Sequence, residues 1–347
     1  KAESRGLGDV YKRQAMIRMD KSLDLKLDKI RNGNYQNTDF IIADAKDGDM
    51  GGGVLAPGPM LDNPEKPKPY KAYLQAMREM TDSGLIDIML MSASSAEILT
   101  DEKIFQNSAV TPAVRYNDTT DVWGQRHSNY KKFPSRNFRT AHLGSVSKFI
   151  DLGLYSITFS NNLETDVESL WGFRAFLEDL ANHELRYFLE VFNPQIDIGI
   201  SEEQIPAYVN DCILKCLAGL TRKEQPLFLK MPYNGPKAME ELCSYDPEGL
   251  IVGVLGGGKG TTRDTFELVR QSEKFGARVA LFGRKINLAE SPLNLVRFMR
   301  SVIEGKLGSL EAVKEYHDCL HKDGITPKMD LEEDQKITET VLLEDAP

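Results

Sequence analysis

Residues 226–260 read PLFLKMPYNGPKAMEELCSYDPEGLIVGVLGGGKG. The stretch holds two short apolar runs, 226–231 and 249–255, which are joined by a more polar connection. Short runs rich in Leu, Ile, Val and Phe are typical of strands that are buried on both faces of a parallel sheet. Six more runs of this kind occur elsewhere, at 38–44, 85–91, 109–115, 153–160, 186–192 and 277–283. The sequence therefore predicts eight buried strands.

Helical patterns fill most of the gaps between these runs. Apolar residues recur every three or four positions, as on the buried face of a helix, at 70–80, 165–180, 203–219, 262–275 and 292–303. Alternation of strand and helix implies a parallel sheet, and eight such units fit an α/β fold, the single (β/α)8 or TIM barrel. An open, doubly wound sheet is the alternative.

The composition of the whole chain narrows the classes of function. Of 347 residues, 41% are hydrophobic and 27% are charged, which is typical of a folded globular protein. The 43 Lys and Arg against 52 Asp and Glu give a net charge of −9, which argues against nucleic-acid binding. No apolar run approaches the ~18 residues of a membrane span. The four cysteines form no C-x-x-C pair, as expected for free thiols in a reducing cytosol. We therefore expect a cytoplasmic protein that acts on a small molecule.

The two ends of the chain differ from the predicted barrel. Residues 1–14 read KAESRGLGDVYKRQ and join no pattern that follows. They look like translated adaptor sequence, so we expect them to be foreign to the fold. Residues 325–347 are polar and acidic, and we expect a tail that packs loosely on the surface. The predicted organisation is one barrel domain over 15–324, enlarged by long loops at 45–69 and 116–150.

Carboxylates cluster where the first predicted strand ends. Asp44, Asp47 and Asp49 follow one another there and precede three glycines at 51–53. In a TIM barrel the active site lies at the carboxyl ends of the strands, so these side chains are candidates for general acid/base work. A solvated acidic turn and a divalent-metal site are the alternative interpretations.

One lysine stands near the end of the sixth predicted strand. Lys230 follows three consecutive apolar residues in the run at 226–231. Loss of solvation at the rim of an apolar barrel favours the neutral amine. Such an amine can attack a carbonyl carbon and form a Schiff base, which then acts as an electron sink. A lysine that extends its ammonium to solvent at a strand end is the alternative.

Glycines and basic residues follow the last two predicted strands. The run at 249–255 is followed by GGGKG and then by a helical pattern, and the run at 277–283 ends in glycine with a basic pair after it. Backbone N–H groups at a helix start bind anions, and loops after strands seven and eight often hold phosphate in this fold. The candidate phosphate-binding residues are Gly257, Gly258, Lys259, Gly283 and Arg284.

Residues 253–259 also approach the P-loop pattern G-x-x-x-x-G-K-[ST]. Gly260 stands where that pattern needs Ser or Thr, and the hydroxyl arrives one position late at Thr261. The sequence therefore favours a phosphate site over an NTPase.

Together, these residues give the chain a resemblance to the class I (Schiff-base) aldolases of the DhnA/DeoC-like group, which includes archaeal-type fructose-bisphosphate aldolase. That family carries its Schiff-base lysine on the sixth strand in a segment such as M-K-I-K-Y-T-G-D. The sequence L-K-M-P-Y-N-G-P is similar to it at Lys230, Tyr233 and Gly235. The second lysine of the family motif is replaced by Pro232.

The resemblance extends to the strand ends on either side. The family has a G-G-P-K segment and a later G-R-N motif, which are similar to Gly257-Gly258-Lys259 and to 283–287 here. The acid of the family's D-H-G motif on the first strand is matched by Asp44 or Asp47, according to how the gap is placed. The likeness is best over 226–305 and looser, though in order, from 38 to 225.

The chain departs from the family pattern in two places. The family often has a tyrosine in Y-P-R-G after strand five, whereas residues 192–195 read FNPQ. The proton donor is therefore missing from that position, and Tyr233 and Tyr116 are the candidates to replace it. The loop at 116–150 is absent from the compact family pattern, and it carries a group of basic and histidine residues: Arg126, His127, Lys131, Lys132, Arg136 and Arg139. It is expected to be either a solvated basic loop or a lid that supplies a second anion contact.

The resemblance implies an aldehyde-lyase of carbohydrate metabolism that acts on a phosphorylated ketose or a dihydroxyacetone-phosphate-type substrate. It implies a Schiff base on Lys230 and acid/base work by Asp47 or else Asp44. Arg115, at the end of the third predicted strand, is a further candidate to contact a polar group of the substrate. Neither a metal nor an organic cofactor is expected, and the partner is a small phosphorylated sugar, with no nucleic acid or membrane. Assembly as a homo-oligomer is expected. The alternatives are a metal-dependent lyase or hydrolase that uses Asp44, Asp47 and Asp49, and a sugar-phosphate-binding barrel without catalysis.

Overall fold

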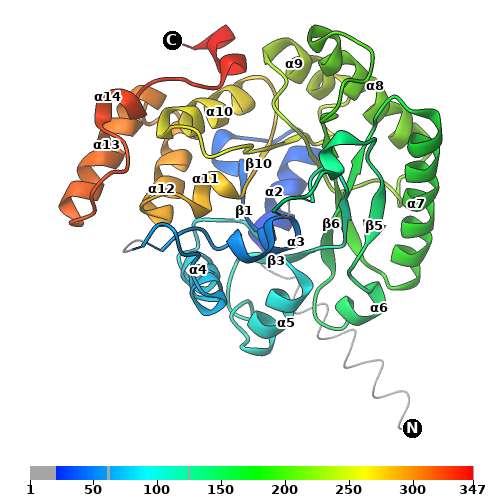
Figure 1. The fold of residues 1–347 in the computed structure, drawn as a ribbon, viewed down its shortest axis with the longest axis horizontal. Coiled ribbons are helices and arrows are strands. Elements are labelled where there is room, and N and C mark those ends of the chain that lie inside the picture. Colours follow the sequence, from blue (N-terminus) through cyan, green and yellow to red (C-terminus); the bar gives the residue numbers. More distant parts are fainter. Residues whose placement is uncertain (1–20, 61–62, 124–125, 347) are drawn as a thin grey trace.

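The computed structural model describes residues 21–346, apart from 61–62 and 124–125, and its centre is a ring of eight parallel strands (Figure 1). Each strand overlaps one of the eight apolar runs, so the strand predictions are confirmed. The predicted segment 1–14 lies outside the described residues. The eight strands are β1 (Ile41–Lys46), β2 (Ile88–Met91), β3 (Thr111–Arg115), β6 (Leu152–Thr158), β7 (Arg186–Phe192), β8 (Leu229–Lys230), β9 (Gly253–Leu255) and β10 (Val279–Phe282).

The sheet closes on itself. Its strand order is β8-β7-β6-β3-β2-β1-β10-β9, which leaves β8 and β9 at the two ends. A parallel bridge between Met231 and Val254 joins those ends, and the Leu229 N–H donates to the Ile251 carbonyl at 2.8 Å. The closed barrel is therefore confirmed, and the open doubly wound alternative is wrong.

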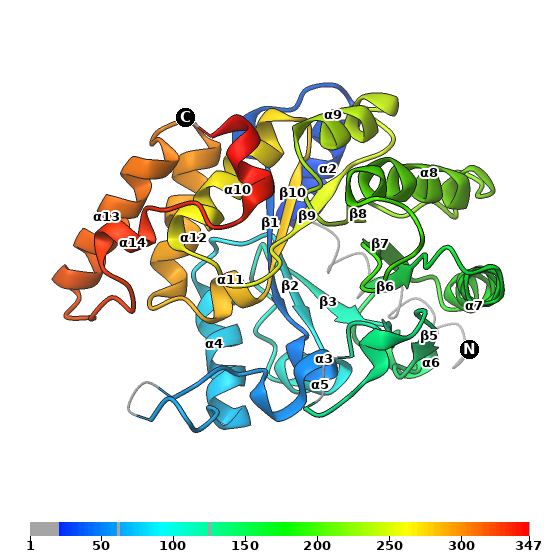
Figure 2. The same ribbon diagram turned by 45° about the horizontal axis from the view of Figure 1, so that its top comes forward.

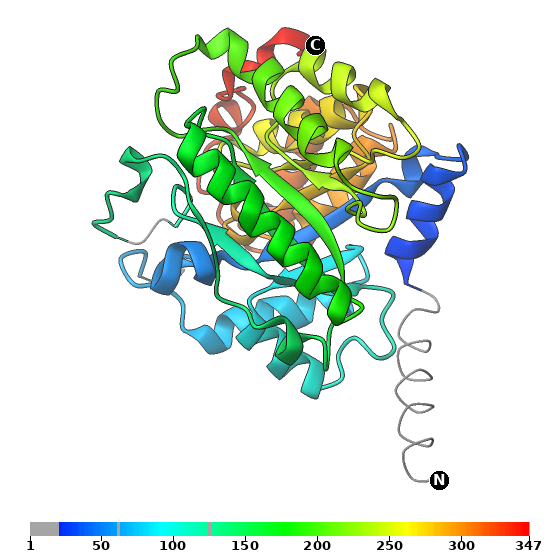
Figure 3. The ribbon, with the colours of Figure 1, turned by 90° about the vertical axis from the view of Figure 1, so that its right-hand side faces the viewer.

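Helices surround the strands on the outside (Figure 2). The five predicted helices are all present, and α7 lies over the outer face of β6 and β7 (Figure 3). In the described part of the chain, no helix is long and apolar enough to span a membrane. The longer helices on the outside of the sheet are α4 (Tyr70–Asp82), α5 (Ala93–Asp101), α7 (Leu163–Asn182), α8 (Ile205–Ala218), α9 (Pro236–Tyr245), α10 (Thr262–Lys274), α12 (Pro292–Ile303) and α13 (Ser309–Lys322).

The start of α7 differs from the sequence prediction. Its N-cap is Asn162, whose side-chain oxygen accepts the Thr165 N–H at 3.2 Å. A capping Asn satisfies an N–H of the first turn as well as a Ser or Thr does. The helix therefore begins at Leu163, two residues before the predicted pattern at 165–180.

Strand alternation determines what fills the barrel. Phe188 of β7 and Phe228, just before β8, point inward, and their rings stack with centroids 4.7 Å apart. The lower end of the barrel is closed by α2 (Ser22–Arg31), a helix that the sequence analysis did not predict. Leu23, Leu27 and Ile30 lie on one face of α2 and are buried against the inner strand residues. Burial of each of these side chains stabilises the folded chain by about 1.5–3 kcal/mol. With this end closed, the barrel opens at the carboxyl ends of its strands.

The long segment at 116–150 contains a small hairpin, in the part of it that the structure describes. Its strands are β4 (Asn117–Thr119) and β5 (Asn137–Arg139), which pair antiparallel. The Asn117 side chain ties the hairpin to β6, since it accepts the Ser156 N–H at 2.6 Å and donates to the Ser156 carbonyl at 2.8 Å. The insertion is thus attached to the upper rim of the barrel.

Residues 325–346 are largely exposed but are fixed to the barrel at several points, so the expectation of a loose tail is wrong. Leu342 is fully buried, and Glu339 pairs with Lys285 of α11 (Arg284–Asn287) at 2.6 Å. Asp264 of α10 accepts the Thr338 hydroxyl at 2.5 Å. An apolar anchor and buried polar contacts, which the acidic composition concealed, therefore fix this C-terminal segment beside the strand ends.

Candidate active site

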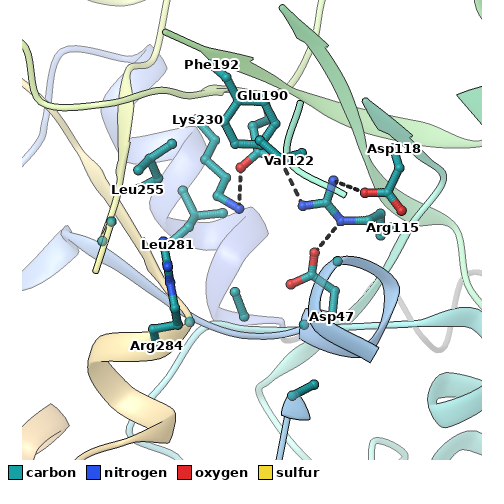
Figure 4. Close-up of a pocket in the computed structure, with 18 of the residues that line it drawn as sticks. Asp47, Arg115, Asp118, Val122, Glu190, Phe192, Lys230, Leu255, Leu281 and Arg284 are labelled. Atoms are coloured by element: carbon teal, nitrogen blue, oxygen red, sulfur yellow. Dashed lines mark hydrogen bonds and ion pairs between the residues drawn. The ribbon is translucent and has the colours of Figure 1, made fainter. Parts of the chain in front are cut away.

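A cavity of about 690 Å³ opens at the carboxyl ends of the strands (Figure 4). It is the end of the barrel opposite α2, where the sequence analysis expected the chemistry. Predicted residues that line it are Lys230, Asp47, Arg115, Gly257, Gly283 and Arg284. Asp44, Tyr233, Gly258 and Lys259 are not among its lining residues.

Lys230 lies on the wall of this cavity. Alternation along β8 points Lys230 inward, above Phe228, and only 6% of the residue is exposed. Leu255 and Phe192 provide apolar surface on the same cavity wall. The Nζ atom lies 2.6 Å from Oε1 of Glu190, so the amine has a carboxylate beside it at hydrogen-bonding distance.

Glu190 is a site residue that the sequence analysis missed. It is 1% exposed, and it contacts Lys230 through Oε1 while Oε2 accepts from Arg115 Nη2 at 3.0 Å and from the Ser156 hydroxyl at 2.7 Å. The signal was present, because Glu190 is the only acidic residue in the predicted strand at 186–192. An acid in the middle of a buried strand needs partners, and here they are cationic.

Arg115 is surrounded by carboxylates. Its Nε donates to Asp47 at 2.5 Å, Nη2 donates to Glu190, and Nη1 lies 3.4 Å from Asp118. Burial lowers the pKa of this guanidinium, but the Asp47, Glu190 and Asp118 charges outweigh burial and hold its pKa above the ordinary value. We expected Arg115 to contact a polar group of the substrate; instead, its donors are engaged by the protein's own groups.

The two carboxylates beside Arg115 have opposite shifts. Burial alone would raise the pKa of Asp47, but the charges of Arg115 and Lys230 hold that pKa below its ordinary value. For Asp118, burial raises the pKa to about 7, and the Asp47 and Glu190 charges act in the same direction against Arg115. Neighbouring acids with separated pKa values are a common arrangement for proton transfer.

The three aspartates in and just after β1 do not converge. Asp44 points to the outer helix layer, because Ala43 and Ala45 of the same strand face the interior. Both of its oxygens lie 2.7 Å from Lys46 Nζ, and burial raises its pKa. Asp49 accepts the Ser92 hydroxyl at 2.7 Å. Among the residues described, no group of three His, Cys, Asp or Glu is arranged to hold a metal ion.

The glycine loops reach the cavity only in part. Gly257 has a φ of +66°, which favours glycine, and a Cβ on Gly283 would meet the Ala45 carbonyl at 3.0 Å. The Arg284 side chain makes no hydrogen bond or ion pair with any residue that the structure describes, and it lines the cavity. Lys259 Nζ lies 3.7 Å from Glu290 instead.

The start of α10 is occupied by the protein's own carboxylates. Asp264 accepts the Thr261 N–H at 3.0 Å, and Asp334 of the C-terminal segment accepts the Thr262 N–H at 2.7 Å. These are the N–H groups that an anion would need at this helix end. The loop after β9 therefore offers the cavity Gly257 rather than the start of a helix.

Neither tyrosine proposed as the replacement donor reaches the cavity. The Tyr233 hydroxyl donates to Gln271 of α10 at 2.9 Å. The Tyr116 ring packs on Gly153, where an added Cβ would lie 2.3 Å from that ring. The Tyr116 hydroxyl donates to the Arg186 carbonyl. Asn193 stands where the family tyrosine is expected, and it bonds to Asn234. Tyr73 of α4 does line the cavity.

The insertion supplies one wall of the cavity. Lining residues from it are Asp118, Asp121, Val122 and Lys131. The basic character that the sequence analysis noted thus reaches the cavity through Lys131. The acids Asp118 and Asp121 were overlooked there.

No family model and no curated protein matches this chain. Solved structures do match it. An archaeal fructose 1,6-bisphosphate aldolase is 17% identical with a TM-score of 0.58, over 82% of this chain and 99% of that one. An archaeal fructose-1,6-bisphosphate aldolase with its catalytic Lys bound to the carbinolamine intermediate is 18% identical, also at 0.58, over 82% and 100%. A fructose-bisphosphate aldolase from Slackia heliotrinireducens is 11% identical at 0.61, over 85% and 90%.

At these identities the likeness establishes the fold. The chain is a TIM barrel, and its architecture is similar to that of solved fructose-1,6-bisphosphate aldolases, one of which is described as Schiff base forming. What it does has to be argued from the side chains in its own cavity.

Proposed function

We propose that the protein is a class I aldolase, which cleaves or forms a carbon–carbon bond next to the ketone of a phosphorylated substrate. The observation that carries the proposal is the Lys230 amine, which lies in the cavity wall at 2.6 Å from Glu190. A buried amine with a proton acceptor at this distance is suited to nucleophilic attack on a carbonyl carbon.

Glu190 is the partner for imine formation. Lys230 must lose a proton before its nitrogen attacks, and Glu190 Oε1 is within direct reach of that proton. The carbinolamine then loses its hydroxyl as water, for which the same carboxyl returns a proton. The product is a protonated imine that withdraws electrons from the neighbouring carbon–carbon bond.

Asp47 is suited to accept the proton of the hydroxyl on the carbon that departs in cleavage. As the carbon–carbon bond breaks, the hydroxyl on the departing carbon gives up its proton. That carbon and its oxygen then form the aldehyde group. That hydroxyl becomes strongly acidic during cleavage, so a carboxylate of low pKa can accept its proton. Arg115 and Lys230 keep Asp47 in this ionised form by lowering its pKa.

Arg284 is the group that suits a substrate phosphate. It lines the cavity, and it has no partner within the described residues. Gly257 and Gly283 bring backbone close to the same wall. A guanidinium with unused donors binds phosphate oxygens well, so the phosphate is expected on this side, away from the carboxylates.

The metal-dependent alternative has less support. It requires Asp44, Asp47 and Asp49 to share one ion. Instead, each carboxylate has a separate partner: Asp44 is bound by Lys46, Asp47 by Arg115 and Asp49 by Ser92. A metal-dependent lyase would lose its activity on chelation, whereas the proposed aldolase retains it.

Replacement of the lysine tests the proposal. Lys230→Met is expected to abolish cleavage across a panel of ketose phosphates, because Lys230 is the buried lysine among the described residues that line the cavity. Lys131→Met is the matched control, since Lys131 also lines the cavity but is exposed. Turnover by Lys230→Met would refute the proposal. Phosphate-ligand binding by the wild-type protein without any turnover would favour the non-catalytic barrel.

A further inference from the structure

We propose that Asp118 is the catalytic carboxyl that moves the proton on the carbon next to the imine. The inference rests on the proposed function, because the enamine left after cleavage must gain a proton at that carbon. In the family that the sequence resembles, a tyrosine stands after strand five, and here that position is Asn193. The insertion at 116–150 brings Asp118 into the cavity by another route.

The position of Asp118 is set by the hairpin. Asp118 is the central residue of β4 and pairs with Phe138 of β5. Its neighbour Asn117 holds Ser156 of β6 by two hydrogen bonds, and the Ser156 hydroxyl bonds to both Arg115 and Glu190. The hairpin, the arginine and the carboxylate beside Lys230 therefore form one connected polar structure.

The surroundings of Asp118 leave its carboxyl available. It is 2% exposed and lines the cavity, and its nearest cation, Arg115 Nη1, lies 3.4 Å away. Asp47 is held much more tightly, at 2.5 Å from Nε of the same guanidinium. Asp47 and Asp118 approach Arg115 from different sides (Figure 4), so one arginine orients two acids.

The protonation states of the cavity acids support this division of roles. Burial raises the pKa of Asp118 to about 7, so the group is present in both forms near neutral pH. Arg115 and Lys230 keep Asp47 ionised by lowering its pKa. Glu190 is already engaged by Lys230 and Arg115. An acid that must both give and take a proton works best with a pKa near the working pH.

The proposed step is balanced without any further reactant. In the direction of bond formation, the Asp118 carboxylate removes a proton from the carbon next to the imine. The electron pair of that C–H bond becomes the second bond of the enamine, and the C=N pair moves to the Lys230 nitrogen as a lone pair. In the direction of cleavage the protonated carboxyl returns the proton, and the imine forms again.

Hydrogen exchange into a donor ketone isolates this step. Dihydroxyacetone phosphate is incubated with the protein in D2O, and deuterium at the carbon next to the carbonyl is followed by NMR. In parallel, borohydride reduction reports the imine on Lys230. Asp118→Asn is expected to slow the exchange by roughly 100-fold, while the borohydride adduct forms as in the wild type. Asp118→Glu is expected to restore part of the exchange.

Two further variants are the comparisons. Asp121→Asn makes the same chemical change in the same insertion, at a cavity residue whose Oδ1 accepts the Ser135 hydroxyl at 2.8 Å. Its exchange is expected to stay within about twofold of the wild type. Tyr73→Phe removes the phenolic hydroxyl of a tyrosine that lines the cavity, and its exchange is expected to persist.

The outcomes test the role of Asp118 separately from the proposed aldolase function. Formation of the adduct with a loss of exchange below tenfold in Asp118→Asn would overturn the role of Asp118 and leave the aldolase proposal standing. Loss of exchange in Tyr73→Phe alone would transfer the role to that tyrosine. Absence of any adduct in the wild type would overturn the proposed function, and the assignment of Asp118 with it.

Discussion

At the scale of single residues, the cavity is organised by charges that alternate in sign. Lys230 contacts Glu190, Glu190 contacts Arg115, and Arg115 contacts Asp47 and Asp118. Each acid is buried, and each has a cation within reach, as burial of charge requires. Asp44 lies outside this chain of contacts and pairs with Lys46 behind the strand.

Glu190→Gln tests the link between the lysine and its acceptor. The amide keeps the size of the side chain but cannot take a proton from Lys230, so imine formation is expected to slow by roughly 100-fold or more. The measurement is the rate of adduct formation with dihydroxyacetone phosphate under borohydride. Ser156→Ala is the comparison, because it removes one hydrogen bond to Glu190 and leaves the carboxylate. Equal rates for Glu190→Gln and the wild type would contradict the role of this carboxylate.

The raised pKa of Asp118 has a consequence for stability that does not depend on catalysis. The folded chain holds this proton up to a pKa of about 7, whereas an unfolded chain releases it near pH 4. Between these values the folded state binds more protons, so its stability falls as the pH rises. Asp118→Asn removes this fall in stability with rising pH. Its free energy of unfolding, relative to the wild type, is expected to rise from pH 5 to pH 8 in denaturant titrations. A constant difference across that range would show that Asp118 titrates normally.

Several site residues were predictable from the sequence because each follows a buried run. Lys230 is the lone cation within its predicted run, and Arg284 follows the predicted run at 277–283, which ends in glycine. Glu190 and Asp118 were missed, although a lone acid inside a strand and an acid three residues past a strand end were visible signals. Asp44 and Asp47 could not be separated, because that choice depends on the strand face that Asp44 occupies and on the turn after β1 that places Asp47.

At the scale of elements, the strands were predictable because burial on both faces imposes continuous apolar runs. The hairpin of β4 and β5 was not, because Asn117–Thr119 is short and polar and is held by side-chain bonds to β6. The helix α2 was missed because its apolar face carries only Leu23, Leu27 and Ile30. Tertiary contacts determine both elements, so local patterns gave little indication of them.

The C-terminal segment is expected to support the phosphate side of the cavity. Glu339 pairs with Lys285, whose Nζ also donates to the Lys259 carbonyl, so the segment connects the loops after β9 and β10. Glu339→Gln leaves a buried ammonium with a weaker partner. We expect a lower melting temperature and weaker binding of inorganic phosphate, measured by calorimetry. Glu332→Gln is the control, because Glu332 is exposed on the same segment. Identical behaviour of the two variants would show that the pair is incidental.

At the scale of the whole molecule, the net charge of −9 conceals an uneven distribution inside the cavity. Acids surround the amine, and Arg284 stands on another part of the wall with no partner among the described residues. A substrate that fits both has an uncharged, hydroxylated reacting end and a phosphate further away. The fold contributes by bringing strand ends from along the whole chain to one face.

Arg284→Ala tests whether the positive charge on this part of the cavity wall binds the substrate phosphate. The variant is expected to lower the rate of adduct formation per unit concentration of dihydroxyacetone phosphate by roughly 10- to 100-fold, as the loss of a charge-assisted hydrogen bond would. Unphosphorylated dihydroxyacetone is the matched ligand, and its rate is expected to stay unchanged. Equal losses for the two ligands would mean that Arg284 supports the structure and does not bind phosphate.

The most direct test of the central claim is mass spectrometry after borohydride reduction in the presence of dihydroxyacetone phosphate. The account predicts one adduct per chain, located by peptide mapping on the segment that contains Lys230 and absent from Lys230→Met. No adduct on the wild-type chain, or an adduct on another lysine that persists in Lys230→Met, would contradict it.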